Sequence, residues 1–121
     1  LADRKADQGG APVYFYMLNW QTPVQGGKWR SPHALEIGMV FDNVAKSAAM
    51  SGTSEEAQAI ADMMSESWLA FARSGDPNNF TVPQWPAYTS SVRAMMLFDV
   101  TPEVKIDPHG EQRNALAVAA D

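Results

Sequence analysis

The run of apolar and aromatic residues at positions 13–18, VYFYML, constrains the fold more than any other feature of this chain. It shows no alternation of apolar and polar residues, so it predicts a strand that is buried on both faces. Such strands belong to the interior of parallel sheets that helices cover. A strand of this kind needs a neighbour on each side, and the rest of the sequence offers few candidates. We therefore expect an α/β fold that is incomplete on its own.

The clearest other element is a helix from residue 55 to about residue 73. Thr53 and Glu56 have the spacing of a capping box at its start, and Gly75 is placed to end it. Apolar residues recur along the segment with the spacing of one helix face. We expect this stripe to lie in the core, and it consists of Ala57, Ile60, Ala61, Met64, Trp68, Phe71 and Ala72.

Shorter segments complete the expected domain. A helix at the N-terminus ends at the glycine pair 9–10, residues 19–34 are loop-like, and residues 35–40 start a short helix. Residues 42–54 are small and polar and predict a surface connection. Two further strands are predicted at 94–98 and 104–106, the second at a half-exposed edge, and a C-terminal helix is predicted at 111–120.

Composition and charge exclude several functions. A chain of 121 residues fits one small domain, and 45% hydrophobic with 19% charged residues is typical of a globular protein. The formal net charge is −5 and the basic residues form no cluster, so we expect no nucleic-acid partner. No apolar run is long enough for a membrane span. The N-terminal residues have no apolar core of a signal peptide, and the absence of cysteine leaves the redox compartment undecided, so both a cytoplasmic and a secreted protein stay open.

No cofactor and no metal site is predicted. The chain has no cysteine, and its two histidines, His33 and His109, lie far apart with no further histidine nearby. The glycine pairs do not form a phosphate-binding loop before a helix. Glu55 and Glu56 lie at a helix start, where the helix dipole favours negative charge, so they need no catalytic explanation.

His33 is the one candidate for chemistry. It lies in the loop after the predicted buried strand, and functional loops in α/β sheets lie beyond the carboxyl ends of the strands. An imidazole exchanges protons near neutral pH, as general base catalysis requires. The alternative is a surface histidine without a catalytic role. No serine stands in a Gly-x-Ser-x-Gly elbow, so the chain offers no nucleophile.

Several segments, in this order, resemble the type B carboxylesterases, an α/β-hydrolase family that includes para-nitrobenzyl esterases and cholinesterases. Residues 10–16 (GAPVYFY) resemble a late central strand of the family. Residues 32–37 (PHALEI), with Val40 and Phe41, resemble its His-Ala/Gly-x-Glu-Leu-Pro-x-Val-Phe motif. Trp68 and residues 71–78 (FARSGDPN) resemble its Trp-x-x-Phe-Ala-Arg-Thr-Gly-x-Pro-Asn motif. Residues 85–88 (WPAY), 96–99 (MLFD) and 107–108 (DP) continue the match.

The resemblance implies that residues 1–121 are the C-terminal part of an α/β-hydrolase domain in a serine carboxylic ester hydrolase. It implies that His33 is the base of a Ser-Glu/Asp-His triad whose serine and acid lie upstream. The glutamate that matches Glu36 in the family is not the triad acid, so we interpret Glu36 as structural. The implied partner is a small-molecule ester, and the isolated chain is expected to be inactive. Gly38 and His109 depart from the family pattern.

Two other interpretations stay open. In one, the parent protein is a non-catalytic, esterase-like binding or adhesion module; in the other, the chain is a free-standing interaction domain. A doubly buried strand without neighbours argues against the second, because it would expose apolar surface and sheet edges. For the same reason we expect the isolated chain to self-associate. Trp20, Trp29 and Met39 are candidate pocket residues near the histidine loop, with core or surface packing as their alternative.

Overall fold

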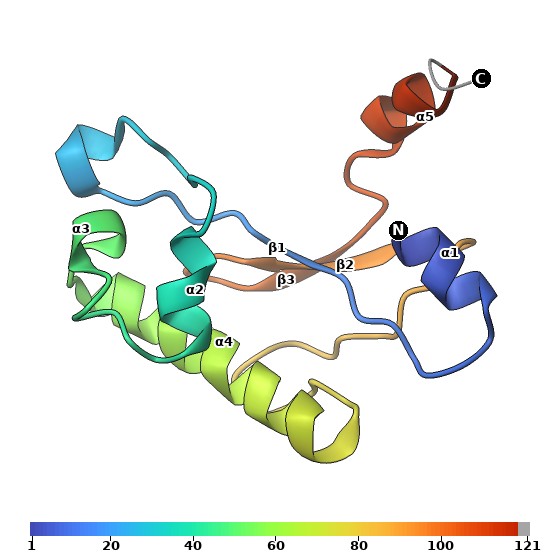
Figure 1. Cartoon of the computed structure of the whole chain (residues 1–121), viewed down its shortest axis with the longest axis horizontal. Helices are drawn as coiled ribbons and strands as arrows, with labels where there is room; N and C mark the ends of the chain where they lie inside the picture. The colour runs from blue at the N-terminus through green and yellow to red at the C-terminus, as the bar shows by residue number, and fades with distance from the viewer. Residues whose placement is uncertain (119–121) are drawn as a thin grey trace.

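The computed structural model describes residues 1–118, in which a small three-stranded sheet lies beside one long helix, with shorter helices toward its two ends (Figure 1). The strands are β1 (Tyr16–Leu18), β2 (Ala94–Phe98) and β3 (Glu103–Ile106). The helices are α1 (Ala2–Asp7), α2 (Leu35–Val40), α3 (Ala48–Ser51), α4 (Glu55–Ser74) and α5 (Gly110–Val118), and a 3₁₀ turn, η1, spans Val24–Gly27. Positions 119 and 120 of the predicted C-terminal helix lie outside the described residues.

The sheet has the order β1-β2-β3. β1 runs parallel to β2, with Tyr16 opposite Met96, and β3 runs antiparallel to β2. Every residue of β2 is buried, because it is the central strand. The parallel pair and the helices around it confirm the predicted α/β class.

β1 differs from the strand that the apolar run predicts. Its paired part is only Tyr16–Leu18, these residues are half-buried, and Phe15 is exposed. The reason is its position, because β1 is an edge strand whose second side has no partner within residues 1–118. A strand buried on both faces, as the sequence predicts, would need helices over both faces of the sheet, and a further strand would cover its open edge.

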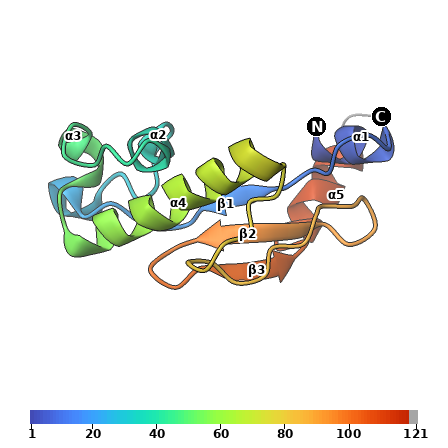
Figure 2. The ribbon, with the colours of Figure 1, turned by 90° about the horizontal axis from the view of Figure 1, so that it is seen from below.

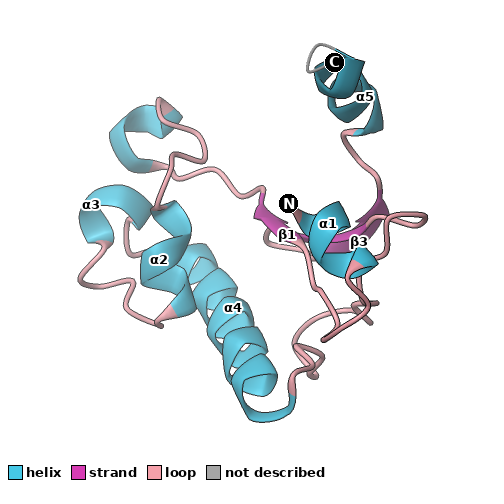
Figure 3. Cartoon of the chain, turned by 45° about the vertical axis from the view of Figure 1, so that its right-hand side comes forward, coloured by secondary structure: helices cyan, strands magenta, loops and turns pink. Residues whose placement is uncertain are grey.

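α4 is the long helix that packs on the sheet (Figures 2 and 3). Its side chain Trp68 meets the ring of Tyr16 edge to face, with centroids 4.7 Å apart, and Met64 is fully buried. Phe71 and Ala72, which the periodicity places in the core, are exposed. Phe71 borders a hollow of about 160 Å³ instead of a filled core, which explains its exposure.

The start of α4 also corrects the sequence analysis. The N-cap is Ser54 rather than Thr53, because Ser54 has an extended backbone and its Oγ accepts a hydrogen bond from the Ala57 N–H at 3.2 Å. The predicted end is confirmed. Gly75 is left-handed, with φ 78°, and its N–H donates to the Phe71 carbonyl oxygen at 2.7 Å.

Residues 42–54 are more than a surface connection. They contain α3, and Val44 lies in the core beside Leu35 and Met39 of α2. Gly38 of α2 lies directly against Ser47, and a Cβ atom at position 38 would overlap with the Ser47 side chain. A glycine therefore stands at position 38 because two backbone segments approach closely there.

Candidate functional site

The loop that carries His33 begins and ends at the carboxyl end of β1 (Figure 1). The backbone N–H groups of Asn19 and Trp20 both donate to the Phe98 carbonyl oxygen, at 2.8 and 3.2 Å. At the other end of the loop, the Ser31 hydroxyl donates to the Leu18 carbonyl oxygen at 3.1 Å. The residues just before His33 are thus held at the edge where the parallel strands end, which is where α/β sheets carry functional loops.

His33 itself lies between two fixed points in the chain. Ser31 is the first, and the second is Leu35, which is 1% exposed and whose N–H donates to the Pro32 carbonyl oxygen at 3.2 Å. Ala34 has left-handed backbone angles, φ 70° and ψ 5°, and this turn leads directly into α2. His33 is exposed, so a reactant could reach its imidazole and exchange a proton with it.

Glu36 lies in the first turn of α2, where a negative charge complements the positive end of the helix. Burial raises the pKa of the Tyr16 hydroxyl, and the charge of Glu36 raises it further. Across residues 1–118, no ion pair joins Glu36 to His33. The position of Glu36 fits the structural role that the sequence analysis gives it.

The three pocket candidates separate into core and surface. Trp20 and Met39 are buried core residues, and Trp20 Nε1 donates to Glu56 at 3.5 Å. Trp29 is 52% exposed and borders a hollow of about 160 Å³. We call this the Trp29 hollow, and it is lined by Thr22, Trp29, Pro32, Ala49 and Met50. It adjoins the residue immediately before His33.

The described part of the chain holds no group of three or more histidine and acidic side chains that could bind a metal ion. In the same part, no helix has both the length and the apolar character needed to cross a bilayer. Ser31, the serine closest to His33 in the sequence, uses its hydroxyl proton in the bond to Leu18. It is therefore not arranged as a nucleophile activated by His33.

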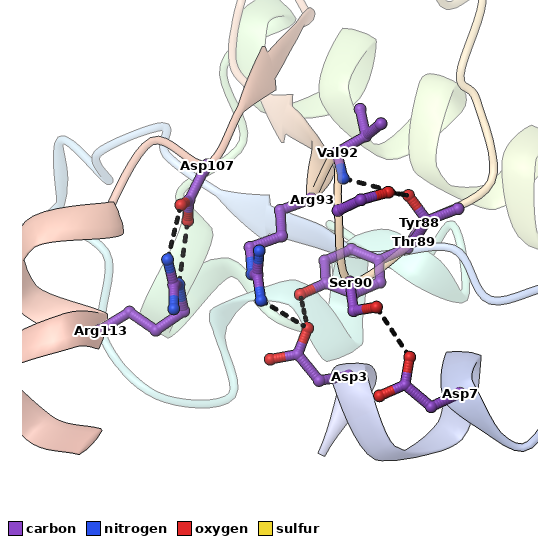
Figure 4. Close-up of polar contacts among 10 residues, drawn as sticks. Asp3, Asp7, Tyr88, Thr89, Ser90, Val92, Arg93, Asp107 and Arg113 are labelled. Atoms are coloured by element: carbon purple, nitrogen blue, oxygen red, sulfur yellow. Dashed lines mark hydrogen bonds and ion pairs between the residues drawn. The ribbon is translucent and has the colours of Figure 1, made fainter. Parts of the chain in front are cut away.

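A polar cluster lies near the start of β2, at the end away from the His33 loop, and the sequence analysis did not predict it (Figure 4). Asp3 of α1 accepts a hydrogen bond from the Tyr88 hydroxyl at 2.8 Å and pairs with Arg93 at 3.4 Å. Arg113 of α5 donates two hydrogen bonds to Asp107, at 3.2 and 2.8 Å, which lowers the pKa of that carboxyl. Each charge has a partner, so we interpret the cluster as the attachment of α1 and α5. Partners so distant in sequence leave no local signal.

His109, the second histidine, lies at the border of the cluster. It is exposed and, together with Arg93, Asp107 and Arg113, lines a cavity of about 350 Å³. The structure thus places the two histidines at opposite ends of β2, His33 near its carboxyl end and His109 near its start. They cannot act on one reaction centre.

Comparison with known proteins gives consistent results. The model of the carboxylesterase family matches residues 1–116. Carboxylesterase 5A of Felis catus is 38% identical over 97 residues, which are 73% of this chain and 17% of that protein. The solved carboxylesterase EST55 of Geobacillus stearothermophilus has a TM-score of 0.78 at 39% identity, over 94% of this chain and 24% of that chain. A thermophilic PNB esterase has a TM-score of 0.75 at 25% identity, and the match covers 85% of this chain and 21% of that chain. The chain spans only a small part of each relative.

Proposed function

The chain belongs to the carboxylesterase family, and we propose that it is the C-terminal part of a serine carboxylesterase in which His33 is the general base. Its sheet and helices are part of the α/β-hydrolase fold of these relatives. The observation that carries the proposal is the place of His33. The side chain is exposed, and the loop is held at the carboxyl end of β1 by Ser31.

In the proposed reaction, the His33 imidazole takes the proton of a serine hydroxyl while the serine oxygen attacks the carbonyl carbon of an ester. The imidazolium gives this proton to the alcohol as the alcohol leaves, and the acyl group stays on the serine. The imidazole then takes a proton from water, whose oxygen attacks the acyl carbon. The proton passes to the serine oxygen as the carboxylic acid leaves. The substrate is a small-molecule carboxylic ester, and the chemistry needs no cofactor.

The nucleophile and the acid of the triad are proposed to lie in the rest of the protein. The 121 residues contain no Gly-x-Ser-x-Gly, and Glu36 pairs with no histidine in the described structure. In this fold the chain order is serine, acid, histidine, which agrees with a segment that supplies the last member.

Labelling with a fluorophosphonate, which bonds covalently to an activated serine, tests this proposal. The isolated chain should neither be labelled nor hydrolyse p-nitrophenyl acetate. The full-length protein that contains it should be labelled, and His33→Ala should slow that labelling about 10²- to 10⁴-fold, the usual contribution of a general base. An unchanged rate in His33→Ala, or catalytic turnover by the isolated chain, would contradict the proposal. A full-length protein without any reactive serine would favour a non-catalytic binding module instead.

A further inference from the structure

Trp29 is an exposed aromatic side chain that its loop holds in one position. It is 52% exposed, yet its Nε1 donates a hydrogen bond to the Gln25 side chain at 3.1 Å. The Lys28 ammonium group lies 5.0 Å from the centre of its ring, within the range of a cation–π interaction. Tryptophan is common at binding sites because it presents a large, rigid apolar face together with one polar group.

The backbone around Trp29 and His33 is strained. Gln25, Arg30 and Ala34 have φ values of 53°, 54° and 70°, in the left-handed region that disfavours side chains with a Cβ atom. Asp42, Arg93 and Asp107 are the other non-glycine residues of this kind in the described chain, so half of the six lie in this one short stretch. Such strain persists where the surrounding structure fixes it, and it is concentrated at active sites and ligand clamps.

The Trp29 hollow has the size and polarity for a flat apolar group. Its volume is about 160 Å³, and an apolar cavity of about 150 Å³ admits a benzene molecule. Four of its five lining residues are apolar, and the hydroxyl of the fifth, Thr22, is used in a hydrogen bond to the Met50 carbonyl oxygen. The hollow therefore offers a ligand apolar contact area and no free hydroxyl proton for a hydrogen bond. Pro32 is both one of its walls and the residue before His33.

We propose that the Trp29 hollow binds the flat apolar part of the ester substrate, and that Trp29 determines specificity for esters with a phenyl-sized group. The inference rests on the proposed function of His33, because the hollow gains this role only if the reacting carbonyl lies at His33. Trp29 contacts a part of the substrate that does not react. Its contribution falls on binding, and hence on KM, more than on kcat.

The test uses esters that differ in their ring but have similar leaving groups, in the full-length protein. Trp29→Ala should raise the KM for benzyl acetate or for ethyl phenylacetate about 10-fold, the scale of one aromatic contact. It should change the KM for ethyl acetate less than about 2-fold, and Trp29→Phe should keep most of the ring preference. Phe80→Ala is the matched control, because Phe80 is fully exposed and borders none of the hollows described above.

A binding measurement separates this inference from the proposed function. His33→Ala leaves the Trp29 hollow intact, so this variant should still bind benzyl acetate in an equilibrium titration. The double variant His33→Ala with Trp29→Ala should bind benzyl acetate about 10-fold more weakly. If the unaltered protein hydrolyses no ester, the proposed function fails, and this titration still decides on the hollow. Equal affinity with and without Trp29, or an equal loss in Phe80→Ala, overturns the inference.

Discussion

The Ser31 hydroxyl donates a hydrogen bond to the carbonyl oxygen of Leu18, 3.1 Å away, and this bond closes the loop that leads to His33. Leu18 is the last residue of β1, so the bond links the start of the histidine turn to the end of the strand. Leu35, the buried first residue of α2, fixes the other side of His33. The place of the histidine in this chain thus depends on its backbone anchors.

Ser31→Ala should therefore reduce catalysis by the full-length protein, although it leaves the His33 imidazole itself unchanged. We expect kcat to fall about 10-fold with little change in KM, because an imidazole that is free to move spends less time in the reactive geometry. The free energy of unfolding should fall by no more than about 1 kcal/mol, the net value of one hydrogen bond. Ser31→Thr keeps a hydroxyl and should retain most of the activity. Equal kcat values for the unaltered protein and Ser31→Ala would show that the bond does not position His33.

Ala34 offers a test of the strained turn. A residue with a Cβ atom loses about 1–2 kcal/mol in the left-handed region, and the φ of Ala34 is 70°. Ala34→Gly should leave the free energy of unfolding unchanged or raise it by up to about 1 kcal/mol. Glycine relieves the backbone strain, but it also increases the conformational entropy of the unfolded chain, which offsets part of that stabilisation. Ala34→Val should lower it by about 1 kcal/mol or more. Urea unfolding of both variants decides, and a clear loss in Ala34→Gly would contradict the left-handed turn.

The close contact of Gly38 and Ser47 predicts a pair of compensating changes. Gly38→Ala should lower the free energy of unfolding by about 1–3 kcal/mol, because the new Cβ would overlap with Ser47. Ser47→Gly removes both overlapping atoms and should restore most of the loss in the double variant. Gly10→Ala is the control, since a Cβ there would meet no atom within 4 Å. A double variant no more stable than Gly38→Ala would rule out the contact.

Tyr88 predicts a loss of stability at high pH. Burial raises the pKa of its hydroxyl, and the hydrogen bond to Asp3 raises it further. The folded chain then holds this proton more tightly than the unfolded chain, so the stabilisation is complete below pH 10.0, the ordinary pKa, and is lost as the pH rises past the folded pKa. Tyr88→Phe keeps the ring that packs on Phe15. Its stability should fall less than that of the unaltered chain between about pH 9 and about pH 12; parallel curves would contradict the raised pKa.

Much of the fold could be predicted from the sequence because local patterns determine it. The helix face of Ala57, Ile60, Ala61 and Met64 is buried as its spacing predicts, and β2 spans the predicted residues 94–98. The cap at Ser54 instead of Thr53 depends on backbone angles that neighbouring residues do not reveal. The exposure of Phe71 depends on what covers the end of α4, which a helical period cannot express.

Of the candidate site, only His33 could be predicted from the sequence, because the family resemblance and the apolar strand before it both indicate this residue. A loop histidine after an apolar strand indicated His33, and its place at the carboxyl end of β1 agrees with that expectation. The burial of Trp20 and the exposure of Trp29 were not separable, because both are tryptophans in the same loop. Val44 was missed because one apolar residue among small polar ones carries no periodic signal.

The most direct test of the central claim compares the two histidines in the full-length protein. His33→Ala should reduce kcat for p-nitrophenyl acetate about 10²- to 10⁴-fold, with the unfolding transition unchanged because the side chain is exposed. His109→Ala, at the far end of β2, should keep kcat within about 2-fold of the unaltered protein, since a surface change there touches no reacting group. If His33→Ala retained most of the kcat, or if His109→Ala lost as much, His33 would not be the base.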